Sequence, residues 1–138
     1  MSGRSFFDTN ILIYADDADA GAKQKKAQAL LSEGIEKGTA VFSTQVLQEY
    51  FSVATRKLGV PAEVARRKID VLASTDVVII RPDLILGAID LHRLHRLAFW
   101  DALIIKSAAA AKCSRVLSED LNHGESIDGV RVENPFLK

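Results

Sequence analysis

The sequence of 138 residues lacks the features that mark disulfide-rich, strongly charged, repetitive or membrane proteins. It has one cysteine, Cys113, so no disulfide can form within the chain, which fits a reducing cytoplasm. Acidic and basic side chains balance at 18 each, so bulk charge gives no argument for a nucleic-acid partner. Repeats, low-complexity segments and proline- or glycine-rich linkers are missing too. We therefore expect a single domain over residues 1–138.

Long apolar runs are also missing. The apolar stretch 6–15 is short and is interrupted by Asp8 and Asn10, unlike a signal peptide. The stretch 97–111 is the most apolar one, but Asp101 and Lys106 interrupt it. We therefore expect no membrane-spanning segment and a cytoplasmic location.

What the sequence does contain is an alternation of short β-type runs with helical ones. Strands are predicted over residues 5–8, 39–43, 77–81 (a buried strand), 115–118 and 130–132, and helices over 9–15, 23–37, 45–58, 62–73, 83–96 and 99–112. Asp8 or Thr9 can cap the first helix, Thr44 can cap the third, and Gly38 ends the second. Strands separated by helices predict an α/β fold, a three-layer sandwich with a central, mainly parallel sheet.

In such a sheet the functional crevice lies at the carboxyl ends of the strands, and acids occur there. Asp8 closes the first strand and Asp120 follows the fourth, although each alone could be a cap or turn residue. Asp101 is harder to explain, because its neighbours on the same helical face are all apolar. They are Ala98, Ile104, Ile105 and Ala108. An unpaired carboxylate on an apolar face is costly, unless it lies in the first turn and faces water. Glu49 lies at the boundary between the apolar arc of its helix and the polar arc, and alone it resembles a surface residue. The polar arc holds Gln45, Gln48, Ser52 and Arg56.

Oxygen-only side chains that converge on one cleft suit a hard cation such as Mg²⁺ or Mn²⁺. Without an ion, the four carboxylates would repel one another and their pKa values would rise. A divalent ion relieves this repulsion and activates water or a phosphoryl oxygen. Phosphodiester hydrolysis is the reaction that such a site does best.

The segments that carry the acids resemble, in order, the four motifs of the PIN domain family. They are residues 8–15 (DTNILIYA), 43–50 (STQVLQEY), 100–104 (WDALI) and 117–124 (LSEDLNHG), and the ending Asn134-Pro135-Phe136 is similar to that of bacterial members. The resemblance implies an α/β/α sandwich with a parallel sheet. It also implies kinship with VapC-type toxins, which cleave RNA with Mg²⁺ or Mn²⁺, are often homodimers, and are commonly blocked by a VapB-type antitoxin.

Carried over residue by residue, the resemblance makes Asp8, Glu49, Asp101 and Asp120 the metal-binding and catalytic acids. Thr9 and Asn10 would support them. Ala98 departs from the pattern, because many relatives have Ser or Thr there. Glu119 beside Asp120 makes the fourth acid ambiguous, although Asp120 fits the pattern better.

Charged clusters outside the four motifs are weaker signals. Arg56 lies on the same helical arc as Glu49 and is a candidate RNA contact, within a basic stretch that continues to Lys68. Asp16, Asp17 and Asp19 fit a solvated helix end. His92 and His95 are spaced for zinc, but no third ligand pattern accompanies them, which favours packing or surface roles.

The leading hypothesis is therefore a divalent-metal-dependent endoribonuclease, with RNA as substrate and toxin of a VapBC-type pair as its role. One alternative is a phosphatase that uses Asp8 as a covalent nucleophile, but it requires a second acid where the chain has Asn10. Another is a non-catalytic module of the same fold that binds RNA or protein.

Overall fold

A sheet with the strand order β3-β2-β1-β4-β6-β5 forms the centre of the computed structural model, which describes residues 3–137. Its strands are β1 (Ser5–Phe7), β2 (Ala40–Ser43), β3 (Asp76–Val78), β4 (Arg115–Leu117), β5 (Ser126–Ile127) and β6 (Val130–Glu133). Neighbouring strands run parallel except for the antiparallel pair β5–β6. The predicted, mainly parallel sheet is confirmed. Residues 1, 2 and 138 of the predicted domain lie outside the described part.

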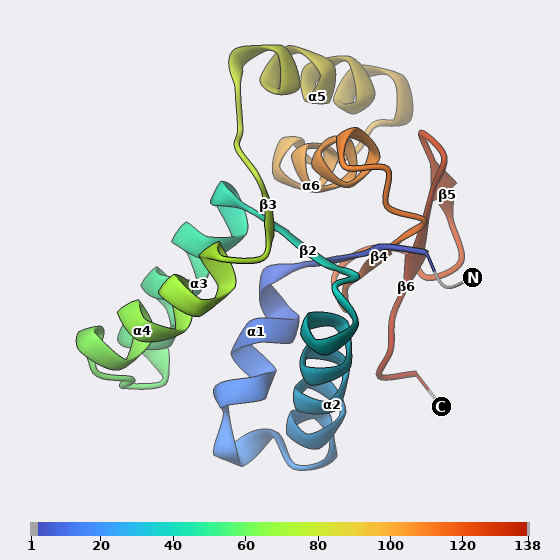
Figure 1. Cartoon of the computed structure of the whole chain (residues 1–138). Helices are drawn as coiled ribbons and strands as arrows, with labels where there is room; N and C mark the ends of the chain where they lie inside the picture. Colours follow the sequence, from blue (N-terminus) through green and yellow to red (C-terminus); the bar gives the residue numbers. More distant parts are fainter. Residues whose placement is uncertain (1–2, 138) are drawn as a thin grey trace.

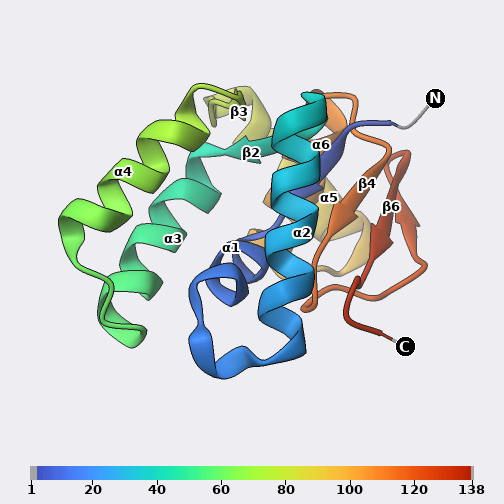
Figure 2. The same cartoon turned by 60° about the horizontal axis from the view of Figure 1, so that its bottom comes forward.

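Helices cover both faces of this sheet (Figures 1 and 2). They are α1 (Thr9–Asp16), α2 (Ala22–Lys37), α3 (Thr44–Lys57), α4 (Ala62–Ala73), α5 (Pro82–His95) and α6 (Phe99–Ala110), with a 3₁₀ turn at Ala18–Ala20. The pair α1–α2 covers one face, α5–α6 covers the other, and α3 packs against α4 on the β3 side (Figure 1). This is the predicted three-layer arrangement. Within residues 3–137, every helix is too short or too polar to cross a bilayer.

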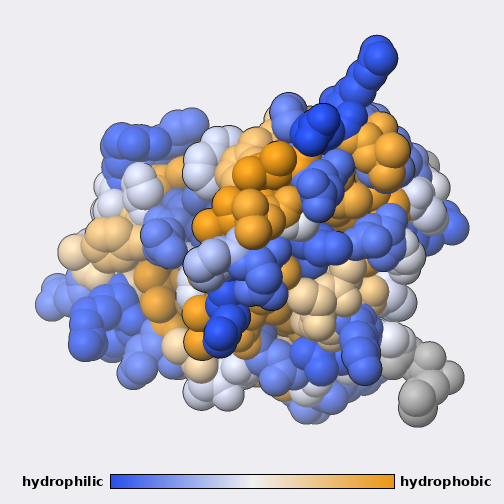
Figure 3. Space-filling view, turned by 90° about the horizontal axis from the view of Figure 1, so that it is seen from above, coloured by the Kyte–Doolittle hydropathy of each residue, from blue (hydrophilic) through white to orange (hydrophobic). Residues whose placement is uncertain are grey.

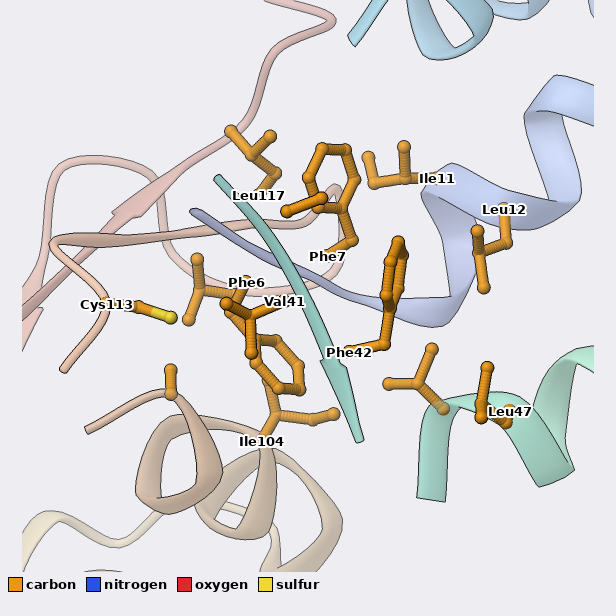
Figure 4. Packing of buried hydrophobic residues seen from close by; sticks show 14 of the residues in the cluster. Phe6, Phe7, Ile11, Leu12, Val41, Phe42, Leu47, Ile104, Cys113 and Leu117 are labelled. Carbon is orange, nitrogen blue, oxygen red and sulfur yellow. The ribbon is translucent and has the colours of Figure 1, made fainter. Parts of the chain in front are cut away.

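Adjacent residues of the central strand supply both halves of the core (Figure 4). Phe6 lies toward Ile104 of α6, whereas Phe7 lies toward Ile11 of α1. This follows from the two-residue period of a strand, and it explains why both phenylalanines are almost fully buried. Phe7 also contacts Phe42 of β2, with ring centroids 5.5 Å apart. The core therefore fixes β1 and β2, whose ends carry the candidate site.

The cap of α3 differs from the predicted one. Ser43 is the N-cap, and its hydroxyl accepts a hydrogen bond from the Val46 amide at 3.3 Å. The predicted cap, Thr44, is instead the first helical residue, and its hydroxyl accepts from the Ile80 amide at 3.2 Å. The Thr44 hydroxyl thus joins α3 to the segment after β3 instead of capping the helix. The predicted end of α2 is confirmed, because Gly38 caps it in the left-handed conformation.

The two edges of the sheet also differ from prediction. The run 77–81 was predicted as a buried strand, but β3 is a short edge strand, and Ile79 just beyond it is 68% exposed. At the other edge, β5 was not predicted. Asp128 (φ 53°) and Gly129 (φ 80°) join it to β6 in a tight turn with Ile127 opposite Val130.

Candidate active site

The candidate site lies where the order of the strands reverses. From β1 the chain proceeds through β2 to β3 on one side of the sheet, and returns on the other side of β1 as β4. Ligands in open α/β sheets bind at such points, beyond the carboxyl ends of the strands. A cleft of about 600 Å³ opens there, which we call the acid cleft. Its lining includes every predicted site residue: Asp8, Thr9, Asn10, Glu49, Arg56, Asp101 and Asp120.

Asp8 lies at the floor of the acid cleft and is 8% exposed. It is the N-cap of α1, and one carboxylate oxygen accepts a hydrogen bond from the Thr9 amide at 2.7 Å. The other accepts from the Ser118 hydroxyl at 2.7 Å. Burial raises the pKa of Asp8 to about 6, against the lowering effect of these hydrogen bonds, and the negative charges of Asp120 and Glu49 add to the rise.

Asn10 connects the two acids that follow β1 and β4. Its side-chain nitrogen lies 3.4 Å from Asp8 Oδ2 and 3.2 Å from Asp120 Oδ2. Its side-chain oxygen accepts a hydrogen bond from the Glu119 amide at 3.1 Å. The predicted supporting role of Asn10 thus has a structural basis, since Asn10 holds the loop after β4 against α1.

Helices α3 and α6 contribute the other two acids. Glu49, in the second turn of α3, accepts a hydrogen bond from the Thr9 hydroxyl at 2.7 Å. Asp101 lies in the first turn of α6, half-buried, and makes no side-chain hydrogen bond within residues 3–137. Burial and the negative charges of Asp120 and Glu49 raise the pKa of Asp101. The sequence had singled out Asp101 for its apolar helical neighbours, with a first-turn acid that faces water as the alternative, and the structure has it in the first turn and half-buried.

Glu119 is engaged away from its neighbour Asp120. Lys23 of α2 donates to its carboxylate at 2.5 Å, and the Tyr14 hydroxyl donates to the other oxygen. Burial would raise the pKa of Glu119, but these two hydrogen bonds outweigh it and hold the pKa below its ordinary value. Glu119 is thus paired with a cation, which favours Asp120 as the fourth acid of the cleft.

A family model confirms the resemblance found in the sequence. The model of the PIN domain matches residues 5–125, which include all four acids. The chain belongs to the PIN domain family.

Solved structures of similar fold include bacterial toxins and toxin–antitoxin complexes. VapC20 of Mycobacterium tuberculosis, described as a toxin that cleaves the sarcin-ricin loop, superposes with a TM-score of 0.69 at 21% identity, over 84% of this chain and 91% of that one. A toxin–antitoxin complex from Klebsiella pneumoniae gives 0.68 at 21%, over 96% and 98%. VapBC2 of Rickettsia felis, bound to a promoter DNA fragment, gives 0.65 at 18%, over 94% and 97%. At these identities the likeness shows the PIN fold. A search of the curated proteins gave no match.

The donor set of this PIN domain fits a hard divalent cation. The four acids offer only carboxylate oxygens as ligands, and such oxygens suit Mg²⁺ or Mn²⁺. Burial raises the pKa of Asp8 and the negative charges of Asp120 and Glu49 add to the rise, so a bound cation would stabilise the ionised form of Asp8. Within residues 3–137, no three acidic, histidine or cysteine side chains form a ready-made metal cage. The metal role of the acids therefore depends on their chemistry and on the cleft they share.

Cations lie at the same cleft. Arg56 and Lys57, in the last turn of α3, line it and are exposed. Lys68, by contrast, lies 2.7 Å from Asp16, which also accepts a hydrogen bond from Tyr50. The interpretation of Asp16 as part of a solvated helix end was therefore wrong, because it joins α1 to α3 and α4.

The structure also contains site residues that the sequence did not reveal. Ser118, fully buried at the end of β4, contacts Asp8, and Gln45, 8% exposed, lines the acid cleft although it was placed on the polar arc of its helix. Both lie within the motif segments 117–124 and 43–50, but nothing in the sequence distinguishes them from the other residues of those segments. His92 and His95 are exposed, in line with surface roles, and Cys113 is buried as expected of a small apolar side chain.

Proposed function

We propose that this PIN domain is a divalent-metal-dependent endoribonuclease. The observation that carries the proposal is the convergence of Asp8, Glu49, Asp101 and Asp120 on one cleft at the reversal point of the sheet. Four carboxylates in one half-buried hollow destabilise one another unless a cation joins them. Membership of the PIN family supports nuclease activity, and the VapC toxins of the same fold support RNA as the substrate.

In this proposal the four acids hold Mg²⁺ or Mn²⁺, with Asp8 and Asp101 as the most direct ligands. When bound, the ion supplies the charge that stabilises the phosphoryl group and eases the deprotonation of water. Thr9 orients Glu49 through its hydroxyl, and Asn10 keeps Asp120 close to Asp8. Arg56 and Lys57 on the rim bind phosphates that flank the scissile bond.

The test is an assay of end-labelled single-stranded RNA with Mg²⁺, with Mn²⁺ and with EDTA. An endoribonuclease yields internal fragments in either metal and none in EDTA. Release of inorganic phosphate, with a phosphorylated Asp8 that can be trapped, would instead support the phosphatase alternative. Retention of intact RNA without cleavage would support the non-catalytic alternative.

We further propose that the chain is the toxin of a VapBC-type pair, blocked by a VapB-type antitoxin, and that it forms a homodimer. The complexes from Klebsiella pneumoniae and Rickettsia felis support an antitoxin partner. The test is to express this chain together with the product of whichever reading frame lies just upstream of its own. A stable complex in which RNA cleavage is inhibited supports the pairing, and an adjacent product that neither binds nor inhibits contradicts it.

A further inference from the structure

A second groove adjoins the acid cleft, and of the four acids only Glu49 lines it. Its volume is about 570 Å³, within the range of small-molecule sites. We call it the Trp100 groove, and its lining includes Gln45, Gln48, Ile80, Ile85, Trp100 and Leu103. Gln45, Glu49 and Trp100 line both the groove and the acid cleft, so the two hollows lie side by side. A ligand that reaches the acids can therefore extend into the groove.

Trp100 presents an aromatic face at the boundary between the two hollows. Its side chain is 61% exposed, although it directly precedes the half-buried Asp101. The ring of Phe99 meets it edge to face, with centroids 5.1 Å apart and an interplanar angle of 72°. This contact limits the rotation of the indole. An exposed, supported indole is a platform on which a nucleobase can stack.

Two amide side chains of α3 line one wall of the groove. Gln45 is 8% exposed, and its side-chain oxygen is buried without a hydrogen-bond partner within residues 3–137. An amide that lines a hollow gains a hydrogen bond when the polar edge of a ligand reaches it. Gln48, one turn further along α3, is exposed and offers a second amide. The wall formed by α3 therefore carries both donors and acceptors.

We infer that the Trp100 groove binds one unpaired nucleobase of the RNA, stacked on Trp100 with its polar edge toward Gln45 and Gln48. The inference rests on the proposed ribonuclease function, since the acid cleft would hold the phosphodiester next to that base. Only single-stranded segments can present a base in this way. The groove thus selects unpaired RNA and contributes to base preference at the cleavage site.

An apolar protein surface fits the groove less well. Exposed apolar side chains of α5, including Leu86 and Leu94, lie outside the lining of both hollows. Apolar residues also gather on the face of the molecule seen in Figure 3. An apolar partner that covers the groove would bury the exposed amide of Gln48 without a hydrogen bond, whereas the edge of a base supplies one. The position of the groove beside the acid cleft also favours a ligand that carries both a flat ring and a phosphate.

The experiment uses the fact that Trp100 is the only tryptophan in the chain. Its fluorescence is followed while short single-stranded RNAs, each of one base type, are added to wild-type protein in EDTA at low ionic strength. RNA binding is followed in parallel by the anisotropy of end-labelled RNA. We expect quenching that follows the binding curve and differs among the four bases. RNA binding without any change in Trp100 fluorescence, or no RNA binding, would overturn the inference.

Variants then separate stacking from a general loss of structure. Trp100→Ala should weaken RNA binding roughly tenfold or more, because one stacked base contributes that much affinity. Trp100→Tyr should recover most of the loss, and Gln48→Met should reduce the differences among bases. Leu94→Ala, which removes another exposed apolar side chain from outside the groove, is the matched control. Equal affinity of Trp100→Ala and Leu94→Ala would overturn the inference.

Two further outcomes distinguish the groove from the nuclease. Cleavage with Mg²⁺ but no quenching of Trp100 would refute the base site and leave the ribonuclease. Base-dependent quenching without cleavage would support the base site and refute the ribonuclease. A fluorescence shift that depends on protein concentration and prevents quenching by RNA would show that a second copy covers Trp100, and would overturn the inference in favour of a protein interface.

Discussion

The hydroxyl of Ser118 donates a hydrogen bond to the Asp8 carboxylate at 2.7 Å, between the ends of the adjacent strands β1 and β4. Ser118 is fully buried and Asp8 nearly so, which makes the bond a fixed part of the acid cleft. It stabilises the ionised form of Asp8 and lowers the pKa that burial raises. Ser118 is therefore a positioning residue for the acid at the floor of the cleft.

Replacement of this hydroxyl should make metal binding more sensitive to acid. In Ser118→Ala the pKa of Asp8 rises above its present value of about 6, so a proton competes more strongly with the cation at low pH. We expect the loss of Mn²⁺ affinity to be greatest below pH 6 and to shrink as the pH rises. Calorimetric titration with Mn²⁺ across the pH range measures it. Ser107→Ala removes another buried hydroxyl, on α6, and serves as the control. Equal pH profiles for the two variants would contradict the role of Ser118.

Removal of the Asp8 charge should stabilise the metal-free protein at neutral pH. The pKa of Asp8 is about 6 in the folded state and 3.8 as a model value, so the protonated carboxyl is favoured by folding. This stability is complete below pH 3.8 and is lost as the pH rises through about 6, by roughly 3 kcal/mol. In EDTA, the Asp8→Asn variant should keep its free energy of unfolding as the pH rises. At neutral pH it should therefore unfold at a higher urea concentration than wild type. A stability difference that is independent of pH would argue against an uncompensated charge on Asp8.

The two adjacent acids after β4 should differ in their roles. Glu119 is paired with Lys23 and Tyr14, so Glu119→Gln should lower the free energy of unfolding by about 1 kcal/mol. Its affinity for Mn²⁺ should remain close to that of wild type. Asp120→Asn should leave stability nearly unchanged and weaken Mn²⁺ binding about tenfold or more. Calorimetry and urea denaturation measure both quantities, and the reverse result would make Glu119 the fourth acid.

Arg56 should contribute to RNA binding through charge alone. It is exposed at the rim of the acid cleft, where it can contact a phosphate without reading a base. Arg56→Gln should weaken binding to all RNA sequences equally and reduce the slope of log affinity against log salt by about one. Arg67→Gln, exposed on α4 and outside the cleft lining, should change neither quantity. A base-dependent effect of Arg56→Gln would point to direct recognition instead.

Local signals in the sequence predicted the order and type of nearly all elements, whereas contacts between distant segments decided the rest. The end of α2 was predictable because Gly38 alone determines it. The cap of α3 was not, because both Ser43 and Thr44 carry a hydroxyl and the choice depends on the Ile80 amide. The strand β5 has two residues, too few for a periodic pattern, although the turn at Asp128 marks its end.

The residues of the candidate site also fall into those that local sequence marks and those that only the fold brings to the site. Asp101 was predictable because its helical neighbours are apolar, and the structure has it half-buried in the acid cleft. Glu49 alone carried no such signal and depended on the family resemblance. Gln45 belongs by sequence to the polar arc of α3, yet it is buried at the hollow that it shares with Ile80 and Ile85. Such burial depends on the path of the chain after β3, which no local pattern encodes.

The central claim is that the acids of the cleft act together with a divalent ion to cleave RNA. The most direct measurement is the single-turnover rate of RNA cleavage with Mg²⁺ for wild type, Asp101→Asn and Asp83→Asn. Asp83 is an exposed acid in the first turn of α5, outside the cleft lining, so its variant makes the same chemical change elsewhere. We predict that Asp101→Asn cleaves about 100-fold more slowly or worse, while Asp83→Asn matches wild type. Equal rates for Asp101→Asn and wild type, with both folded, would contradict the account.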